Sequence, residues 1–183
     1  QQRGAFRNAE EARAFGVGSR EVLAVDRVSF DILRYNLTQS LEAERFPNWM
    51  QPVTQLRSFP SFLAEMGSGS SIQPFRTVKD YEDWHKRLSG TPPILDGMIA
   101  NMRIGLAKSV TQPKPVMEKV IPQLAALVTT EPEQSLFWGP MKNFPETIPA
   151  ADRERLTAAF RTLIKAQVTP AYQRMHNFVR DEY

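Results

Sequence analysis

Apolar side chains recur three, four or seven positions apart in about five stretches of this sequence, which places them along one face of an α-helix in each. The stretches cover about residues 19–45, 77–90, 94–110, 113–127 and 150–183. No stretch shows the sustained alternation of apolar and polar residues that is typical of a half-buried strand. The sequence therefore predicts an all-α fold, an irregular bundle of about five helices.

The first helix is predicted to begin at Ser19, because serine is a good N-cap, and to end near Arg45, because Pro47 follows. Its apolar stripe consists of Leu23, Phe30, Leu33, Leu37 and Leu41. A stripe of this kind indicates that the helix packs against another element.

The second helix has a defined start and a defined end. Thr77 and Asp80 have the spacing of a capping box, in which each side chain binds the backbone N–H of the other residue. Gly90 is predicted to close the helix. The buried face is predicted to consist of Tyr81, Trp84 and Leu88.

The next two helices carry longer stripes. Between residues 94 and 110 the stripe is Leu95, Met98, Ile99, Met102 and Leu106. After Pro113 it is Val116, Met117, Val120, Ile121, Leu124 and Leu127. Gly97 and Gly105 are expected to allow close neighbours, and Pro122 is expected to kink its helix.

The last helix contains Pro170, which has no N–H and would collide with the carbonyl of Ala166 four residues back. Its apolar residues keep one phase on both sides of the proline: Leu156, Phe160, Leu163, Ile164, Val168, Met175, Phe178 and Val179. The preserved phase favours one bent helix over two separate helices.

Two long loops rich in proline, at about residues 46–76 and 129–149, separate these helices. The first is predicted to contain a short helical turn at 61–65 and a flexible stretch at 67–71, more typical of a linker than of a mobile lid. In the second, aromatic side chains are predicted to hold the loop on the core: Phe137, Trp138 and Phe144. Residues 1–183 are expected to form a single helical domain or a fragment of a larger helical protein, because the sequence has no initiator methionine and ends within a predicted helix.

The charged residues argue against two classes of protein. The net charge is +3, and basic and acidic residues are interleaved, whereas a nucleic-acid-binding protein usually gathers its basic residues into a patch. No apolar run approaches the roughly 18 residues that a transmembrane helix needs. We therefore expect neither a nucleic-acid partner nor a transmembrane segment.

The chain offers few groups for chemistry. It contains no cysteine and two histidines, His85 and His176, and neither histidine belongs to a metal-binding motif. Each is expected to be a surface or half-buried helix residue. Aromatic pairs such as Tyr81 and Trp84 could line a ligand groove, but core packing is the ordinary role at this spacing. The sequence thus predicts no catalytic, cofactor-binding or metal-binding residue, and no cofactor, in this chain.

Several short segments, taken in order along the chain, resemble sequences of a bacterial family catalogued as domain of unknown function 885. They are residues 30–35 (FDILRY), 45–47 (RFP), 74–82 (PFRTVKDYE), 142–145 (KNFP), 168–172 (VTPAY) and 181–183 (DEY). The resemblance covers nearly the whole chain. Members of the family are longer, look all-helical, and carry a His-Glu-x-x-x-Gly-His-His type signature that makes them look like zinc metallopeptidases.

The signature lies downstream of the matched region, so no metal ligand or general base of the family can be assigned to a residue here. The resemblance implies a non-catalytic helical scaffold portion of a zinc-dependent peptidase of the cell envelope, forming one wall of a substrate cleft. It implies as partners the remainder of the polypeptide, which would hold any zinc, and a peptide substrate. It also implies a periplasmic or lipoprotein-anchored location. The alternative is a helical binding or interaction module with no enzymatic activity.

Overall fold

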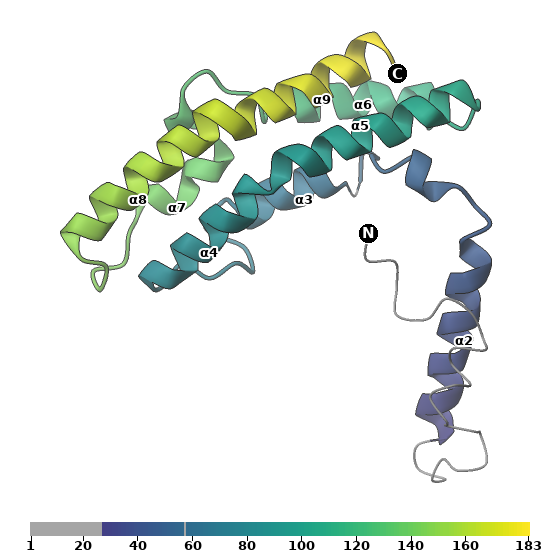
Figure 1. Cartoon of the computed structure of the whole chain (residues 1–183), viewed down its shortest axis with the longest axis horizontal. Helices are drawn as coiled ribbons and strands as arrows, with labels where there is room; N and C mark the ends of the chain where they lie inside the picture. Colours follow the sequence, from purple (N-terminus) through teal and green to yellow (C-terminus); the bar gives the residue numbers. More distant parts are fainter. Residues whose placement is uncertain (1–26, 57) are drawn as a thin grey trace. The chain divides into compact units, whose positions relative to one another are not determined.

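The computed structural model describes residues 27–56 and 58–183 (Figure 1). The chain divides into two units, residues 1–48 and residues 49–183. The described residues form helices and connecting segments and include no strand, which confirms the all-α prediction. None of their helices is long and apolar enough to cross a membrane.

The first unit contains helix α2, Arg27–Ala43. The predicted start at Ser19 and the apolar residue Leu23 lie outside the described residues. Among the described residues, α2 buries no side chain. Phe30, Leu37 and Leu41 of the predicted stripe are only partly buried, and Leu33 is 56% exposed. The structure therefore does not show the packing that the stripe predicted.

The second unit contains the remaining helices. The α-helices are α3 (Phe59–Met66), α4 (Val78–Ser89), α5 (Thr91–Ala107), α6 (Lys114–Ala125), α7 (Gly139–Lys142), α8 (Ala150–Leu163) and α9 (Thr169–Asp181). A π-helical segment, η4 (Ile164–Val168), joins α8 to α9. Short 3₁₀ turns are η1 (Asn48–Met50, at the boundary of the two units), η2 (Pro132–Gln134) and η3 (Leu136–Trp138).

The stretch from α8 through η4 to α9 runs as one long helix in this unit (Figure 1). Helices α5 and α6 both pack on α9, and α4 packs on α8. The largest fully buried side chains are Trp84, Tyr81, Tyr172, Phe137 and Phe160. Aromatic rings from α4, η3, α8 and α9 thus form much of one shared core.

Helix α4 has the predicted start, end and buried face. The hydroxyl of Thr77 accepts a hydrogen bond from the Asp80 N–H at 3.3 Å, and the Asp80 carboxylate accepts one from the Thr77 N–H at 2.8 Å. Gly90 follows the last helical residue. The predicted face, Tyr81, Trp84 and Leu88, is fully buried. These observations confirm the capping box.

The capping box predicts an acid-sensitive helix start. Replacing Asp80 by alanine should cost about 1 kcal/mol at neutral pH. Hydrogen bonds from the N–H groups of Arg76 and Thr77 lower the pKa of Asp80 from 3.8. This carboxylate therefore stabilises the fold above pH 3.8, and its contribution is lost as the pH falls through the lower folded-state pKa. Urea denaturation over a pH series gives the free energy of unfolding of the native protein and of Asp80→Ala. The two values should converge below pH 3.8, whereas a constant difference between them would contradict the prediction.

Helix α5 begins at Thr91, three residues earlier than predicted. Pro92 and Pro93 lie in its first turn, where a helix needs no N–H donor, so they start the helix and do not delay it. A Cβ atom on Gly105 would lie 2.6 Å from the carbonyl oxygen of Val110, which confirms the close neighbour expected there. At Gly97 nothing lies within 4 Å, so that expectation was wrong.

Helix α6 buries Met117, Val120 and Leu124, as the stripe predicted. Pro122 lies inside the helix, and the kink expected there stays a prediction. The short turn predicted at 61–65 is confirmed as helix α3.

The stretch at residues 67–71 is a packed turn, and its prediction as a flexible linker was wrong. Gly67 is buried, and a Cβ atom there would lie 2.7 Å from the ring of Trp84. Gly69 has φ +86° and lies against Pro140. A Cβ atom on Gly139 would lie only 1.9 Å from the carbonyl oxygen of Ser68. Two backbone segments far apart in sequence therefore meet through glycines.

The second irregular segment is held on the core by aromatic rings, as predicted. Phe137 and Trp138 are buried. Phe144 stacks on Tyr81 with ring centroids 5.0 Å apart. The Tyr81 hydroxyl donates a hydrogen bond to the carbonyl of Pro140 at 3.3 Å.

The helix continues through Pro170, which confirms one helix over two. Thr169 has helical dihedrals, φ −56° and ψ −46°, and its N–H donates to the carbonyl of Ile164, five residues back. In a regular α-helix the Thr169 N–H would donate to the carbonyl of Lys165, four residues back. Pro170 has no N–H that could donate to the carbonyl of Ala166. The π-helical turn therefore accommodates the proline without ending the helix.

We expect the substitution Pro170→Ala to keep the fold. It restores one backbone N–H and permits the helix to straighten, which would misalign Met175 and Phe178 against the rest of the core. Circular dichroism should therefore show unchanged or slightly higher helix content, together with a changed near-ultraviolet signal. Loss of the helical spectrum would contradict the continuous helix.

Candidate functional site

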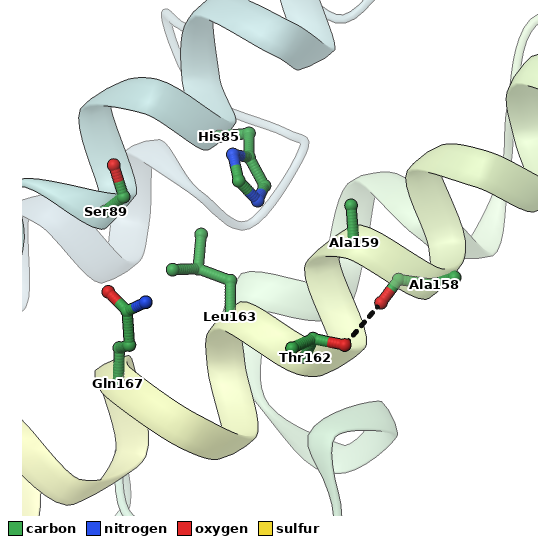
Figure 2. A pocket seen from close by; sticks show the side chains of 7 residues that line it. All are labelled: His85, Ser89, Ala158, Ala159, Thr162, Leu163 and Gln167. Carbon is green, nitrogen blue, oxygen red and sulfur yellow. Dashed lines mark hydrogen bonds between the residues drawn. The ribbon is translucent and has the colours of Figure 1, made fainter.

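A shallow groove lies between α4 and the α8–η4 stretch (Figure 2). Its lining residues are His85 and Ser89 from α4, Ala158, Ala159, Thr162 and Leu163 from α8, and Gln167 from η4. None of the seven is an aspartate, a glutamate, a lysine or an arginine. The groove therefore presents polar side chains beside those of alanine and leucine.

Both hydroxyl groups in this groove donate hydrogen bonds within their own helices. The Ser89 hydroxyl donates to the carbonyl of Lys86 at 2.8 Å, and the Thr162 hydroxyl donates to the carbonyl of Ala158 at 3.0 Å (Figure 2). Both oxygens keep lone pairs that can only accept. Among the seven lining residues, only His85 and Gln167 therefore keep side-chain donors for a ligand.

His85 and Gln167 face this groove from opposite helices (Figure 2). His85 is half-buried, as expected, and its ring lies edge-on to Phe160 with centroids 5.3 Å apart. Among the residues that the structure describes, neither side chain has a hydrogen-bond partner. These two side chains are available to a ligand.

A second groove, between α5 and α9, is closed by its own ion pairs. Arg103 binds Glu182 through two hydrogen bonds of 2.8 and 2.9 Å, and Arg174 binds Asp96 through two of 2.9 Å. Hydrogen bonding to Arg103 lowers the pKa of Glu182. All four side chains are about half exposed, so each pair adds little stability. The ion pairs join α5 to the C-terminal helical stretch, so we assign this groove a structural role.

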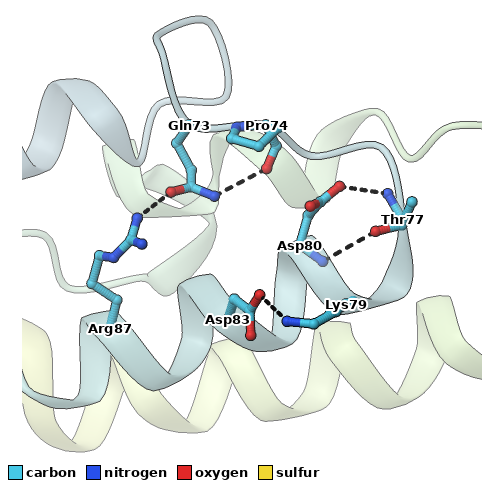
Figure 3. A network of polar contacts seen from close by, with 7 residues as sticks. All are labelled: Gln73, Pro74, Thr77, Lys79, Asp80, Asp83 and Arg87. Carbon is cyan, nitrogen blue, oxygen red and sulfur yellow. Dashed lines mark hydrogen bonds and ion pairs between the residues drawn. The ribbon is translucent and has the colours of Figure 1, made fainter.

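A polar network surrounds the start of α4 (Figure 3). The buried Gln73 side chain donates to the carbonyl of Pro74 at 3.1 Å and accepts a hydrogen bond from Arg87. Lys79 pairs with Asp83 on the exposed side of the helix. The contacts of Gln73 attach the preceding loop to α4, whereas the Lys79–Asp83 pair lies within the helix, so the network is structural.

The described residues include no group of three or more His, Cys, Asp or Glu side chains that could hold a metal ion. His176 is half-buried, as expected, with its Nδ1 atom 3.3 Å from the side-chain oxygen of Asn177. It lies on α9, whereas His85 lies on α4, and the two line different parts of the surface. Burial raises the pKa of the Tyr172 hydroxyl, which donates to the carbonyl of Pro60 at 2.8 Å and so has a structural role.

Sequence reasoning placed no site residue in the chain, and it overlooked the groove. His85 was considered alone, because the partner residues Thr162 and Gln167 lie on a helix remote in sequence. No pattern within one helix connects these residues, so the sequence carries no signal for the groove.

The model of one family, described as "Bacterial protein of unknown function (DUF885)", matches residues 1–183. No curated protein and no solved structure matches the chain. Because the match extends over the full sequence, this chain belongs to the bacterial family DUF885.

Proposed function

We propose that this chain is a non-catalytic helical scaffold portion of a zinc-dependent peptidase of the cell envelope. The zinc ligands and the general base would then lie in another part of the polypeptide, and these residues would build one wall of the cleft that holds a peptide substrate. The proposal draws on the sequence segments that resemble the family and on the hydrogen bonds that fix irregular segments within the second unit.

The observation that carries the scaffold role is a pair of buried tyrosines. Tyr81 donates its hydroxyl hydrogen to the carbonyl of Pro140, and Tyr172 donates to the carbonyl of Pro60. Both rings are fully buried. Each bond fixes a proline-containing segment on a long helix, 59 or 112 residues away in sequence. Such bonds hold irregular segments in one position, as a cleft wall requires.

Helix α2 supports a contact with the remainder of the polypeptide. Val28, Ile32 and Tyr35 are 66%, 56% and 64% exposed. Large apolar side chains gathered on an exposed helix are typical of an interaction surface. The same observation favours the second candidate, a helical interaction module with no enzymatic activity, in which α2 would bind a separate partner.

Peptide hydrolysis by the longer protein separates the two candidates. The proposal predicts that the full-length protein cleaves an unstructured peptide mixture, that a zinc chelator abolishes cleavage, and that residues 1–183 alone do not cleave. Cleavage by residues 1–183 alone would refute the non-catalytic role. A full-length protein that cleaves nothing with added zinc, yet needs α2 to retain a partner protein, would support the interaction module.

A further inference from the structure

We propose that the chain pairs with a second copy of itself through the outer face of α5, with the two α5 helices antiparallel. The outer face consists of five residues spaced three or four positions apart: Ile94, Gly97, Ala100, Ile104 and Ala107. All five are exposed, the two isoleucines by 47% and 41%. The inference goes beyond the proposed function and does not depend on it.

Helix α5 is apolar on two opposite faces. Its inner face, which includes Leu95, Met98 and Met102, is buried in the core of the second unit. Its outer face carries no charged side chain over about four turns of helix. A surface helix normally has a polar outer face, and a helix that is apolar all round is normally buried. The composition of α5 therefore indicates a partner on the outer face.

The sizes of the outer residues fit a second copy in the antiparallel orientation. A two-fold axis beside Ala100 sets Ile104 opposite Gly97 of the second copy. The same axis sets Ile94 opposite Ala107 of the second copy. Among the described residues, nothing lies within 4 Å of a Cβ atom added at Gly97, so this position is open to an incoming side chain. A parallel pair would set isoleucine against isoleucine and glycine against glycine.

The charges beside the outer face fit the same orientation. Asp96 and Arg103 lie on the flank of α5 that meets α9, and each stays about half exposed while paired within its own chain. In an antiparallel pair the same flank of each helix meets, so Asp96 of one copy lies near Arg103 of the other. Complementary charges of this kind fix the orientation of a complex more than they add affinity.

The strength of the pairing follows from the size of the contact. One pair of helices buries less surface than a standard protein–protein interface, although the small side chains allow the two helices to approach closely. We therefore expect a weak dimer, with a dissociation constant on the order of 100 µM.

Sedimentation velocity of residues 1–183 tests the pairing. Between about 10 µM and about 1 mM, the average mass should rise from that of one chain towards that of two. The mass of one chain throughout this range would overturn the proposal and leave the remainder of the longer protein as the partner of this face.

Two variants locate the contact on α5. Gly97→Leu fills the space that Ile104 of the second copy needs and meets nothing within its own chain, so it should keep the circular dichroism spectrum. The dissociation constant should rise at least about tenfold. Ala151→Leu adds bulk at an exposed position of α8 and should leave the dissociation constant unchanged. Equal dissociation constants for the two variants would refute the contact.

Disulfide cross-linking tests the orientation, because the chain contains no cysteine. Ala100→Cys places a thiol beside the two-fold axis, within reach of its counterpart in the second copy. Ala107→Cys places the thiols on the same face but about 20 Å apart in an antiparallel pair. Under mild oxidation the first variant should form a covalent dimer and the second should stay largely monomeric. Equal cross-linking would contradict the antiparallel pair, and no cross-linking of either variant would contradict contact through this face.

Discussion

Replacing Gly139 by alanine is expected to lower the free energy of unfolding by about 3 kcal/mol. The new Cβ atom would lie 1.9 Å from the carbonyl oxygen of Ser68 and 2.6 Å from its carbonyl carbon. Both are backbone atoms, so no side-chain rotation can relieve the overlap. The turn at 67–71 and helix α7 would have to separate, which would also disturb the neighbouring contacts of Gly67 with Trp84 and Phe137.

Urea denaturation provides the measurement, and Gly97→Ala is the matched control. Gly97 lies inside α5 with nothing within 4 Å of an added Cβ atom. Alanine there should raise stability by up to about 1 kcal/mol, because it reduces the entropy of the unfolded chain and favours helix. Equal unfolding midpoints for Gly139→Ala and the native chain would show that the two segments do not meet as described.

Replacing Trp84 by alanine is expected to cost about 4 kcal/mol. The ring is fully buried, and it packs against Gly67 and edge-on to Phe75 with centroids 6.1 Å apart. Arg87 lies over the ring at 5.9 Å. Alanine would leave a cavity at the junction of α4 with the turn at 67–71, and the rigid surroundings could close it only in part.

The variant Trp84→Phe separates packing from hydrogen bonding. The indole Nε1 atom is buried with no hydrogen-bond partner, so phenylalanine removes volume but breaks no hydrogen bond. We expect a cost of about 1.5 kcal/mol, well below that of alanine. Thermal or urea unfolding of the three proteins gives the comparison. A loss equal to that of Trp84→Ala would contradict the account in which the cost grows with the volume removed.

Features set by neighbouring residues could be predicted from the sequence. Thr77 and Asp80 lie three positions apart and cap α4 through backbone groups beside them. Tyr81, Trp84 and Leu88 share one face of the same helix by spacing alone. Both signals act within one or two turns of helix, so no knowledge of the tertiary structure is needed to interpret them.

Features that depend on residues far apart in the sequence could not be predicted from it. Glycines and serines at 67–71 have the composition of a linker, and only the approach of Gly139 makes them a packed turn. The stripe of α2 predicted packing, but the stripe does not specify its partner, and the described structure supplies none. The groove depends on His85 and Gln167, which come together only when α4 packs on the α8–η4 stretch.

The central claim is that these residues build a scaffold and hold no metal centre. The most direct test is elemental analysis of purified residues 1–183, prepared without chelator, incubated with excess zinc and then exchanged into metal-free buffer. The chain has two histidines, on separate helices, and no cysteine, whereas a tight zinc site needs three or four nitrogen, sulfur or oxygen ligands. The account predicts far less than one zinc per chain, and about one tightly held zinc per chain would contradict it.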